Sequence, residues 1–480
     1  MMESPNALSR HPGSLMKVRS RILSMMSLVG CGLGLLWMAH VGWQNGDLTK
    51  STVDDSIRTL RGGTLQDRLA ACRELARFGV AAQDIAVPVL IKTLRDPEAS
   101  LRLAAAEALG QVAFSPIKAR QAAGALRGAL EDSDPGVRIA AVDAIGVLSG
   151  SKQANRDPAL EPKIAIDILT EALDDRDVRV RSAIVKALAL VGPATNEAPP
   201  PPLIMALDDE SEDVRANACL AIARFKQGLD PIVARLFQAL SRLDPGNRTR
   251  CVSALCNIEA ASVSSTILPT LLGALDNRDM EAQYAATYIL VKLAPDSKQA
   301  IPALIKVLTG SVELGPIRWP APDSGRGSAI ALGELAPGTD QSAAAITALT
   351  DFLRRADPTR RDGAADALGR FSRDAAPAIP VLINGLRESL PSDASFTPGT
   401  SMATALGRIA PGTPLADQAM AALAEALDAK SRWTRLEAVK SLAAFGPISA
   451  AAVSRLRRFE SDPDFEIRHA AAVALKSVSR

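Results

Sequence analysis

Residues 134–148 read DPGVRIAAVDAIGVL, and the chain returns to this pattern at residues 177–191, DVRVRSAIVKALALV, and at residues 464–478, DFEIRHAAAVALKSV. Each copy has an acidic residue, an arginine four residues later, a stretch rich in alanine and then an aliphatic residue. A pattern that returns every 20 to 50 residues is typical of repeat architectures. The arginine of this pattern therefore serves as the anchor for aligning the rest of the chain.

The anchor recurs along most of the sequence, and three further copies keep the pattern but carry Gln283, Gly325 or Gly399 in its place. The twelve copies lie 33 to 43 residues apart. Every copy has Leu or Ile seven residues after the anchor and an apolar residue ten residues after it. These offsets lie on one face of a helix with 3.6 residues per turn. The anchor arginines are Arg68, Arg102, Arg138, Arg181, Arg215, Arg248, Arg361, Arg435 and Arg468.

A second helical stretch precedes each anchor, as in residues 85–94 and 378–386. An acidic residue between the two stretches can cap the second helix by accepting its free amide hydrogens. One hairpin cannot bury its own apolar face, so neighbouring hairpins must stack. With aromatic residues at only 3%, the core must consist of small and aliphatic side chains. We therefore predict an all-α fold, an α-α superhelix of about twelve helical hairpins. The predicted capping residues are Asp134, Asp177, Asp244, Asp279, Asp357 and Asp464.

The segments DSDPGVRIAAVDAIG (132–146) and DPTRRDGAADALG (357–369) resemble HEAT repeats of the phycobilisome-lyase type, and the resemblance extends over residues 53–480. It implies a HEAT-type α-solenoid in which the second helix of each hairpin lines a concave face. It also implies that the aspartate and arginine of each turn form a structural ladder between neighbouring repeats. Because the arginine is absent at Gln283, Gly325 and Gly399, the sequence does not predict a ladder contact at these three positions.

The first 52 residues differ from the repeats. Residues 22–43 contain no Asp, Glu, Lys or Arg, and as a helix they would span roughly 30 Å, about one hydrocarbon core. We predict a transmembrane signal-anchor helix here, preceded by a basic cytoplasmic segment at 1–21 and followed by a linker at 44–52. The basic flank orients the repeats outside the cytoplasm, which predicts a single-pass protein of the bacterial inner membrane.

Two alternatives for this segment stay open, a cleaved signal peptide and a lipoprotein modified at Cys31. Residues 28–31, LVGC, resemble a lipobox. Against both alternatives, the apolar run continues past Cys31 and no small-x-small cleavage site follows it. Gly30 and Gly34 form a GxxxG pair that could let two such helices approach closely, so a homodimer through this pair is a further option.

Catalytic and metal-binding patterns are missing from the sequence. Hydroxylases related to the resembled family hold iron through His-Glu pairs, but His11, His40 and His469 are the only histidines and none precedes a glutamate. We find no GxSxG, P-loop or HExxH pattern. We therefore expect no enzyme activity, no metal and no cofactor. The bilin-lyase activity of the resembled family has no short motif, and it stays as the alternative function.

The charges favour a protein partner over nucleic acid. The formal net charge is only +2, with 55 basic and 53 acidic residues. The residues five and nine positions after each anchor vary freely, so we expect them to face solvent; they are mixed in sign and almost free of aromatic residues, unlike a phosphate-binding track. The middle of this stripe is its least charged part, which suits protein contacts. The candidate partner-binding residues are Leu220, Ser253, Tyr288, Lys292 and Ile330, with Trp319 in the loop at 309–327.

Tyr284 and Tyr288 are the only tyrosines and lie one helical turn apart. We expect Tyr288 on the exposed stripe and Tyr284 half-buried. Two interpretations remain: the pair is the centre of an interface, or it compensates for the missing arginine at Gln283. The sequence as a whole predicts a membrane-tethered, non-catalytic protein-binding scaffold, with a cofactor- or chromophore-processing repeat protein of the bilin-lyase class as the alternative.

Overall fold

The computed structural model describes residues 52–150, 158–293, 296–311, 323–392, 398–445 and 450–478. Helices make up all the regular secondary structure in these ranges, and no strand occurs in them. The predicted all-α fold class is therefore confirmed. The chain divides into two compact units, Met1–Glu161 and Pro162–Arg480.

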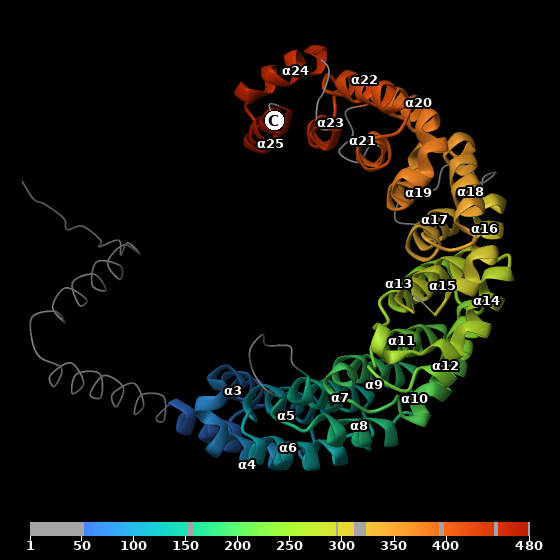
Figure 1. The fold of residues 1–480 in the computed structure, drawn as a ribbon. Helices are drawn as coiled ribbons and strands as arrows, with labels where there is room; N and C mark the ends of the chain where they lie inside the picture. Colours follow the sequence, from blue (N-terminus) through green and yellow to red (C-terminus); the bar gives the residue numbers. More distant parts are fainter. Residues whose placement is uncertain are drawn as a thin grey trace, which may run out of the picture. The chain divides into compact units, whose positions relative to one another are not determined.

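The first unit consists of stacked helical hairpins (Figure 1). Residues 52–62 are helical and pair with the first complete helix. The complete helices are α3 (Leu65–Phe78), α4 (Gln83–Thr93), α5 (Ala99–Val112), α6 (Pro116–Ala129) and α7 (Pro135–Ser149).

The second unit continues the same alternation of helices. They are α8 (Pro162–Glu171), α9 (Val178–Val191), α10 (Pro201–Met205), α11 (Glu212–Ile222), α12 (Asp230–Leu240), α13 (Pro245–Cys256), α14 (Leu268–Asp276), α15 (Met280–Lys292), α16 (Ile301–Gly310), α17 (Ser324–Leu335), α18 (Ser342–Arg355), α19 (Asp362–Arg370), α20 (Ile379–Ser389), α21 (Pro398–Ile409), α22 (Ala416–Ala426), α23 (Arg432–Leu442), α24 (Ala450–Arg457) and α25 (Phe465–Val478).

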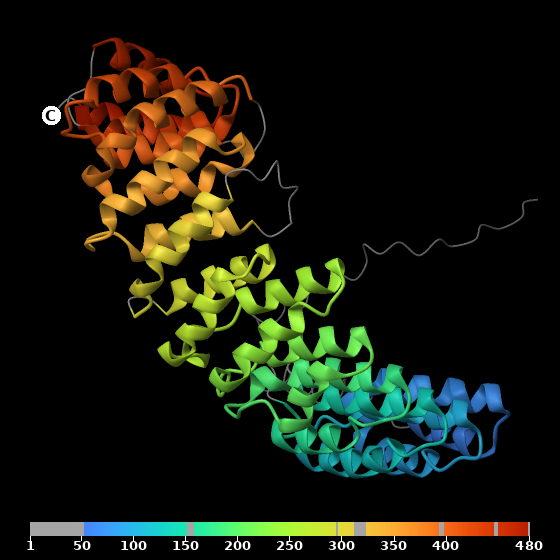
Figure 2. The same cartoon turned by 90° about the vertical axis from the view of Figure 1, so that its right-hand side faces the viewer.

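Within each unit the helices form two rows (Figure 1 and Figure 2). The odd-numbered helices, which carry the anchors, pack on one another in sequence and form the odd row; the even-numbered helices form the even row behind them. Each even helix also packs on the odd helix that follows it, as α4 does on α5 and α20 on α21. This is the arrangement of an α-solenoid, so the predicted stacking of hairpins is confirmed within each unit.

The core follows the predicted register. The Leu or Ile seven residues after the anchor is 0% exposed in eleven of the twelve repeats, from Leu75 to Leu442, and only Leu475 in the last repeat is half-buried. Small residues let the odd helices approach closely. A Cβ at Gly333 of α17 would lie 2.8 Å from the Cα of Ala367 in α19, which is too close for any side chain.

The predicted capping holds in most of the repeats. The carboxylates of Asp134, Asp177, Asp244, Asp279 and Asp464 each accept a hydrogen bond from a backbone N–H in the first turn of the following helix. The prediction is wrong at Asp357. There a short 3-10 helix, Pro358–Arg360, intervenes, and α19 begins only at Asp362 with Arg361 as its N-cap, so Asp357 lies too far from the first turn of α19 to cap it.

The predicted localisation as a single-pass membrane protein must be corrected. Among the residues that the structure describes, no helix is long and apolar enough to cross a membrane. The longest of them, α7, has 15 residues and spans about 22 Å, which is shorter than a hydrocarbon core of about 30 Å. The segment at 22–43 on which the prediction rested lies outside the described residues, as do Cys31 and the pair Gly30 and Gly34. The predicted membrane topology is therefore withdrawn.

Candidate protein-binding face

The odd row presents a surface position on every repeat, five residues after the anchor. These side chains lie on helices whose positions three and seven are buried, so the helical period turns position five outward. The exposed ones are Arg73, Glu107, Asp143, Lys186, Ser253, Asp366, Lys440 and Val473, and the half-buried ones are Leu220, Tyr288, Ile330 and Thr404. We call this set the odd-row stripe.

The anchor arginines lie on the same helices as this stripe, at or near the first turn of each helix. Arg102 donates from Nε and one terminal nitrogen to the carboxylate of Asp132 in the next repeat, at 2.6 and 2.8 Å, and from its other terminal nitrogen to the carbonyl of Asp96, at 2.9 Å. This bidentate hydrogen bond lowers the pKa of Asp132 below its usual value. The same contact with the next repeat joins Arg68 to Asp96, Arg181 to Asp209 and Arg248 to Asp279.

The remaining anchor arginines bond mainly within their own repeat. Arg435 donates to the carbonyls of Ala429 and Lys430, both at 2.8 Å. Similar carbonyl bonds are made by Arg138, Arg215, Arg361 and Arg468; Arg215 also reaches a carbonyl and Arg361 a carboxylate in the repeat that follows. All nine arginines thus contact atoms of the protein itself. Links to the following repeat are made by Arg68, Arg102, Arg181, Arg215, Arg248 and Arg361.

Different side chains make the contacts of the missing arginine at Gln283 and at Gly325. The Gln283 amide donates to the carbonyls of Leu275 and Asn277, as an anchor arginine would. At Gly325 the space is filled from the following repeat by Arg360, which is 2% exposed. Arg360 binds the carboxylate of Asp323 at 2.7 and 2.8 Å. The sequence analysis missed Arg360, although the pair of arginines at 360–361, one repeat after a glycine anchor, was a usable signal.

The third position, Gly399, is tied to its neighbours in another way. A Cβ there would lie 2.1 Å from the Ser389 hydroxyl, so any side chain would have to displace this hydroxyl. A backbone hydrogen bond of 3.1 Å from Lys430 N–H to the Leu390 carbonyl joins the two repeats directly. Ladder contacts between repeats therefore do not require an arginine at every anchor.

The tyrosine pair lies at the middle of the odd-row stripe. The rings of Tyr284 and Tyr288 are 4.9 Å apart, and the Tyr284 hydroxyl donates to that of Tyr288 at 3.2 Å. Tyr284 packs against α17 where Gly327 leaves room for its ring, and burial raises its pKa. Tyr288 is half-buried. Gln283 makes the carbonyl bonds of an anchor within its own repeat, while Tyr284 contacts the following repeat, so both interpretations of the pair stay predictions.

The other predicted residues have different surroundings. The ammonium of Lys292 donates to the carbonyls of Cys256 and Ile258 at the end of α13, and burial lowers its pKa. Lys292 is therefore engaged within the protein. Ser253 is exposed, Leu220 and Ile330 are half-buried, and Trp319 lies outside the described residues.

A groove between α23 and α25 was missed by the sequence analysis. Its volume is about 390 Å³. Two residues of the stripe line it, and so does Phe465, one of the exposed large hydrophobic side chains of the odd row. The sequence feature that could have indicated this groove is an aromatic residue at the start of each of these two helices, Trp433 and Phe465. Most other repeats have a polar or small residue near the start of the equivalent helix. The lining residues are Leu436, Lys440, Ala443, Phe465, Glu466, His469, Ala470 and Val473.

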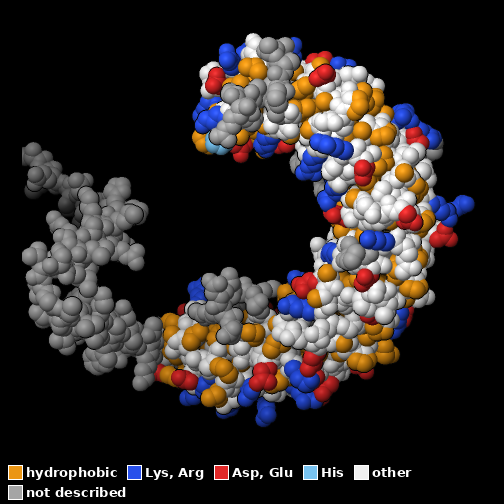
Figure 3. Space-filling view, viewed as in Figure 1, with side chains coloured by type: hydrophobic (Ala, Val, Ile, Leu, Met, Phe, Trp, Pro, Cys, Tyr) orange, Lys and Arg blue, Asp and Glu red, His pale blue; other side chains and the backbone are white. Residues whose placement is uncertain are grey.

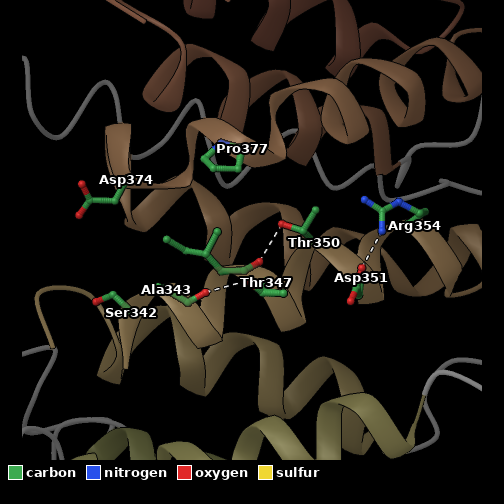
Figure 4. Close-up of a pocket in the computed structure, with 9 residues that line it drawn as sticks. Ser342, Ala343, Thr347, Thr350, Asp351, Arg354, Asp374 and Pro377 are labelled. Carbon is green, nitrogen blue, oxygen red and sulfur yellow. Dashed lines mark hydrogen bonds and ion pairs between the residues drawn. The ribbon is translucent and has the colours of Figure 1, made fainter. Parts of the chain in front are cut away.

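A second groove lies in the even row, between α18 and the 3-10 helix Ser372–Ala378 (Figure 4). Its volume is about 510 Å³. Four of its polar side chains are occupied: Thr347 and Thr350 donate to backbone carbonyls one turn earlier, at 2.9 and 2.7 Å, and Arg354 pairs with Asp351 at 2.6 Å. These side chains offer no convergent set of groups for a ligand. No group of three or more His, Cys, Asp or Glu side chains that could hold a metal ion occurs in the described ranges.

The family comparison agrees with this geometry. A family model described as HEAT repeats matches residues 87–188, 159–223 and 400–476. The matched segments, 87–223 and 400–476, are thus similar to HEAT repeats, and they make up less than half of the chain. No curated protein matches the sequence significantly. The matching model describes HEAT repeats in general, so the phycobilisome-lyase subtype suggested by the sequence is not confirmed.

Solved structures with a similar fold include two of Kap121p and one of a Kap95:Nup1 complex. The first Kap121p structure has a TM-score of 0.61 at 14% identity, and a triple mutant of it has 0.63 at 15%. The Kap95 structure has a TM-score of 0.59 at 14% identity. The matches cover 89 to 90% of this chain but only 49%, 50% and 62% of those chains, so this chain spans about half the length of Kap121p. At this identity the similarity shows the fold alone.

Proposed function

We propose that the protein is a non-catalytic scaffold that binds another protein along its odd-row stripe. The observation that carries the proposal is the contrast between two positions on the same helices. Position seven after the anchor is always aliphatic and almost always fully buried, whereas position five is always at the surface and differs from repeat to repeat. A constant core beneath a variable surface row is what a repeat protein needs to contact an extended partner at several points.

The similar structures support this direction. Kap121p has been solved bound to Pho4p and bound to Nup53p, with TM-scores of 0.50 and 0.51 to this chain, and Kap95 in complex with Nup1. Those partners belong to those proteins. What we transfer to this chain is only the class of function, the binding of a protein by a HEAT-repeat solenoid.

The proposal includes the absence of catalysis. The acidic and basic side chains of the turns hold one another or the ends of helices, as Arg102 and Asp132 do, and Asp134 caps α7. Groups that are occupied in this way are not poised for proton transfer or nucleophilic attack. The alternative, a cofactor- or chromophore-processing protein of the bilin-lyase class, is not favoured, because no observation among the described residues points to it.

The test is the double change Tyr288→Ala with Ile330→Ser. Both side chains are half-buried at the middle of the stripe, and on this proposal their loss should release a co-purifying partner while the melting temperature stays within a few degrees. The matched control changes two exposed residues of the even row, Ile117→Ser and Met205→Ser, which are 71% and 68% exposed. If melting falls and the partner stays bound, or if the control releases the partner equally, the proposal is wrong.

A further inference from the structure

The groove between α23 and α25 brings apolar side chains, aromatic rings and a hollow together on the odd row. Phe465 is 70% exposed and Val473 is 50% exposed. The Phe465 ring stacks on the ring of His469, with centroids 6.1 Å apart and planes tilted by 16°. Exposed apolar groups of this size around a cavity mark binding surfaces more often than scattered single residues do.

Phe465 and Val473 are exposed because of the positions that they occupy in the repeat. Phe465 stands three residues before its anchor, where interior repeats carry Val178 and Met280, which are 40% and 39% exposed. Position five after the anchor, where Val473 stands, is at the surface in every repeat. Interior repeats thus leave both positions at least partly exposed, so the exposure of Phe465 and Val473 does not depend on their place in the last repeat.

Basic and acidic side chains both lie beside the groove. Ion pairs join Glu437 to Lys440 at 2.7 Å, and Asp464 and Glu466 to Arg432. Arg435 and Arg468, in contrast, donate to backbone carbonyls, which do not neutralise their charge.

Two of the arginines also lie over aromatic rings at the start of these helices. Arg468 is 5.8 Å from the ring centroid of Phe465, and Arg432 is 4.4 Å from that of Trp433. Figure 3 shows Lys and Arg side chains, with Asp and Glu side chains among them, beside hydrophobic ones at the end of the chain that carries α25. The positive charge that no ion pair balances is therefore that of Arg435 and Arg468, while Leu436, Ala443 and Ala470 make part of the lining apolar.

We infer that this groove binds an acidic segment of another protein that carries a bulky apolar side chain. The apolar side chain would enter the groove between Leu436 and Val473, and carboxylates on either side of it would meet Lys440 and Arg468. An apolar centre gives affinity and the charged rim gives orientation and rate of association. The inference rests on the proposed function and names the chemistry of one part of the partner.

The experiment measures the binding of short fluorescent peptides to the full chain by fluorescence anisotropy. One peptide has Leu and Phe at its centre between glutamates; a second has lysines in place of the glutamates; a third keeps the glutamates but has alanines at the centre. We expect the first to bind at least about tenfold more tightly than the other two. Its affinity should fall as salt rises, because screening weakens the contacts with the rim.

Two variants tie the binding to the groove. Val473→Asp places a negative charge between the apolar walls and should weaken binding of the first peptide about tenfold or more, and Lys440→Gln should weaken it less and reduce the salt dependence. The matched control is Val178→Asp, an equivalent change at an exposed valine of α9, which should leave the affinity unchanged.

The inference is overturned if the lysine peptide binds as tightly as the acidic one, if no peptide binds, or if Val473→Asp and Val178→Asp behave alike. Such a failure is distinguishable from failure of the proposed function. A chain that fails here but still loses its partner when Tyr288 and Ile330 are changed keeps the proposed function and loses only this groove as a site.

Discussion

Arg360 illustrates how much a single side chain contributes in this repeat array. It is 2% exposed and its guanidinium meets the carboxylate of Asp323, which is 6% exposed, in the space that Gly325 leaves open. A further bond of 2.8 Å joins it to the Ser311 carbonyl at the end of α16. Burying these charges is costly in itself, but removing only one of them leaves the other unpaired in the core.

Arg360→Met should therefore cost about 3 to 5 kcal/mol of local stability, because Asp323 would be left buried without its partner. Native-state hydrogen exchange of the amides in α17 and α19 measures this loss. The control is Arg370→Met, which breaks an exposed pair with Glu334 and should cost about 1 kcal/mol or less. A loss below about 1 kcal/mol for Arg360→Met as well would contradict the interpretation of a strained, essential pair.

Acid should weaken the first unit through its ladder. The hydrogen bond from Arg102 lowers the folded-state pKa of Asp132, so this carboxylate stabilises the fold at any pH above its ordinary value near 4. That stability is lost as the pH falls from about 4 through the lower folded-state pKa. Urea unfolding between pH 5 and pH 2.5 should show a smaller loss for Arg102→Gln than for the parent chain. Equal slopes would show that this pair does not contribute.

At the scale of helices, the core of each repeat depends on two features: the aliphatic residue seven positions after the anchor, and the short distance between neighbouring odd helices. Leu188 of α9 and Leu368 of α19 occupy that position and are both 0% exposed. Changing either to alanine should cost about 2 to 5 kcal/mol of local stability, since a fully buried side chain leaves a cavity. Hydrogen exchange within the affected hairpin is the readout, and Val178→Ala, at an exposed site, is the control. Losses below about half a kcal/mol at both leucines would refute the register.

Glycines on two helices provide a second test of the packing. Gly333→Ala in α17 should destabilise the second unit, because its Cβ would lie 2.8 Å from the backbone of Ala367. Gly273→Ala in α14 meets no atom within 4 Å and should stabilise the same unit by about 0.5 to 1 kcal/mol through helix propensity. The opposite signs of the two shifts in melting temperature are the expected result. A shift of the same sign for both would mean that close approach of α17 and α19 does not limit the packing.

The elements themselves could be predicted because each repeats a short-range pattern. The spacing of Leu188 and its equivalents needs only one helix to be recognised, and an aspartate such as Asp134 caps the helix that follows it directly. Contacts between repeats are not encoded in this way. Arg360 fills the space that Gly325 leaves and binds Asp323, which lies 37 residues earlier in the chain. No local pattern relates Arg360 to Asp323. The groove between α23 and α25 likewise depends on how these two helices pack against each other, which no local sequence pattern specifies.

At the scale of the whole chain, we propose that the odd row is the face that binds another protein. The two units each carry this row, with the same buried layer beneath it. The even row carries exposed apolar residues as well, among them Ile117 and Met205, so exposure alone does not distinguish the two faces. What distinguishes the odd row is that its surface position recurs on every repeat in register.

The most direct test is a site-specific photo-crosslinking scan of the full chain in its native cells. A benzophenone side chain would be introduced at Ser253 and Ile330 on the odd row and at Ile117 and Met205 on the even row. We expect both odd-row positions to yield the same protein adduct and the even-row positions to yield none. Adducts from the even row alone, or equally from both rows, would contradict the claim that the odd row is the binding face.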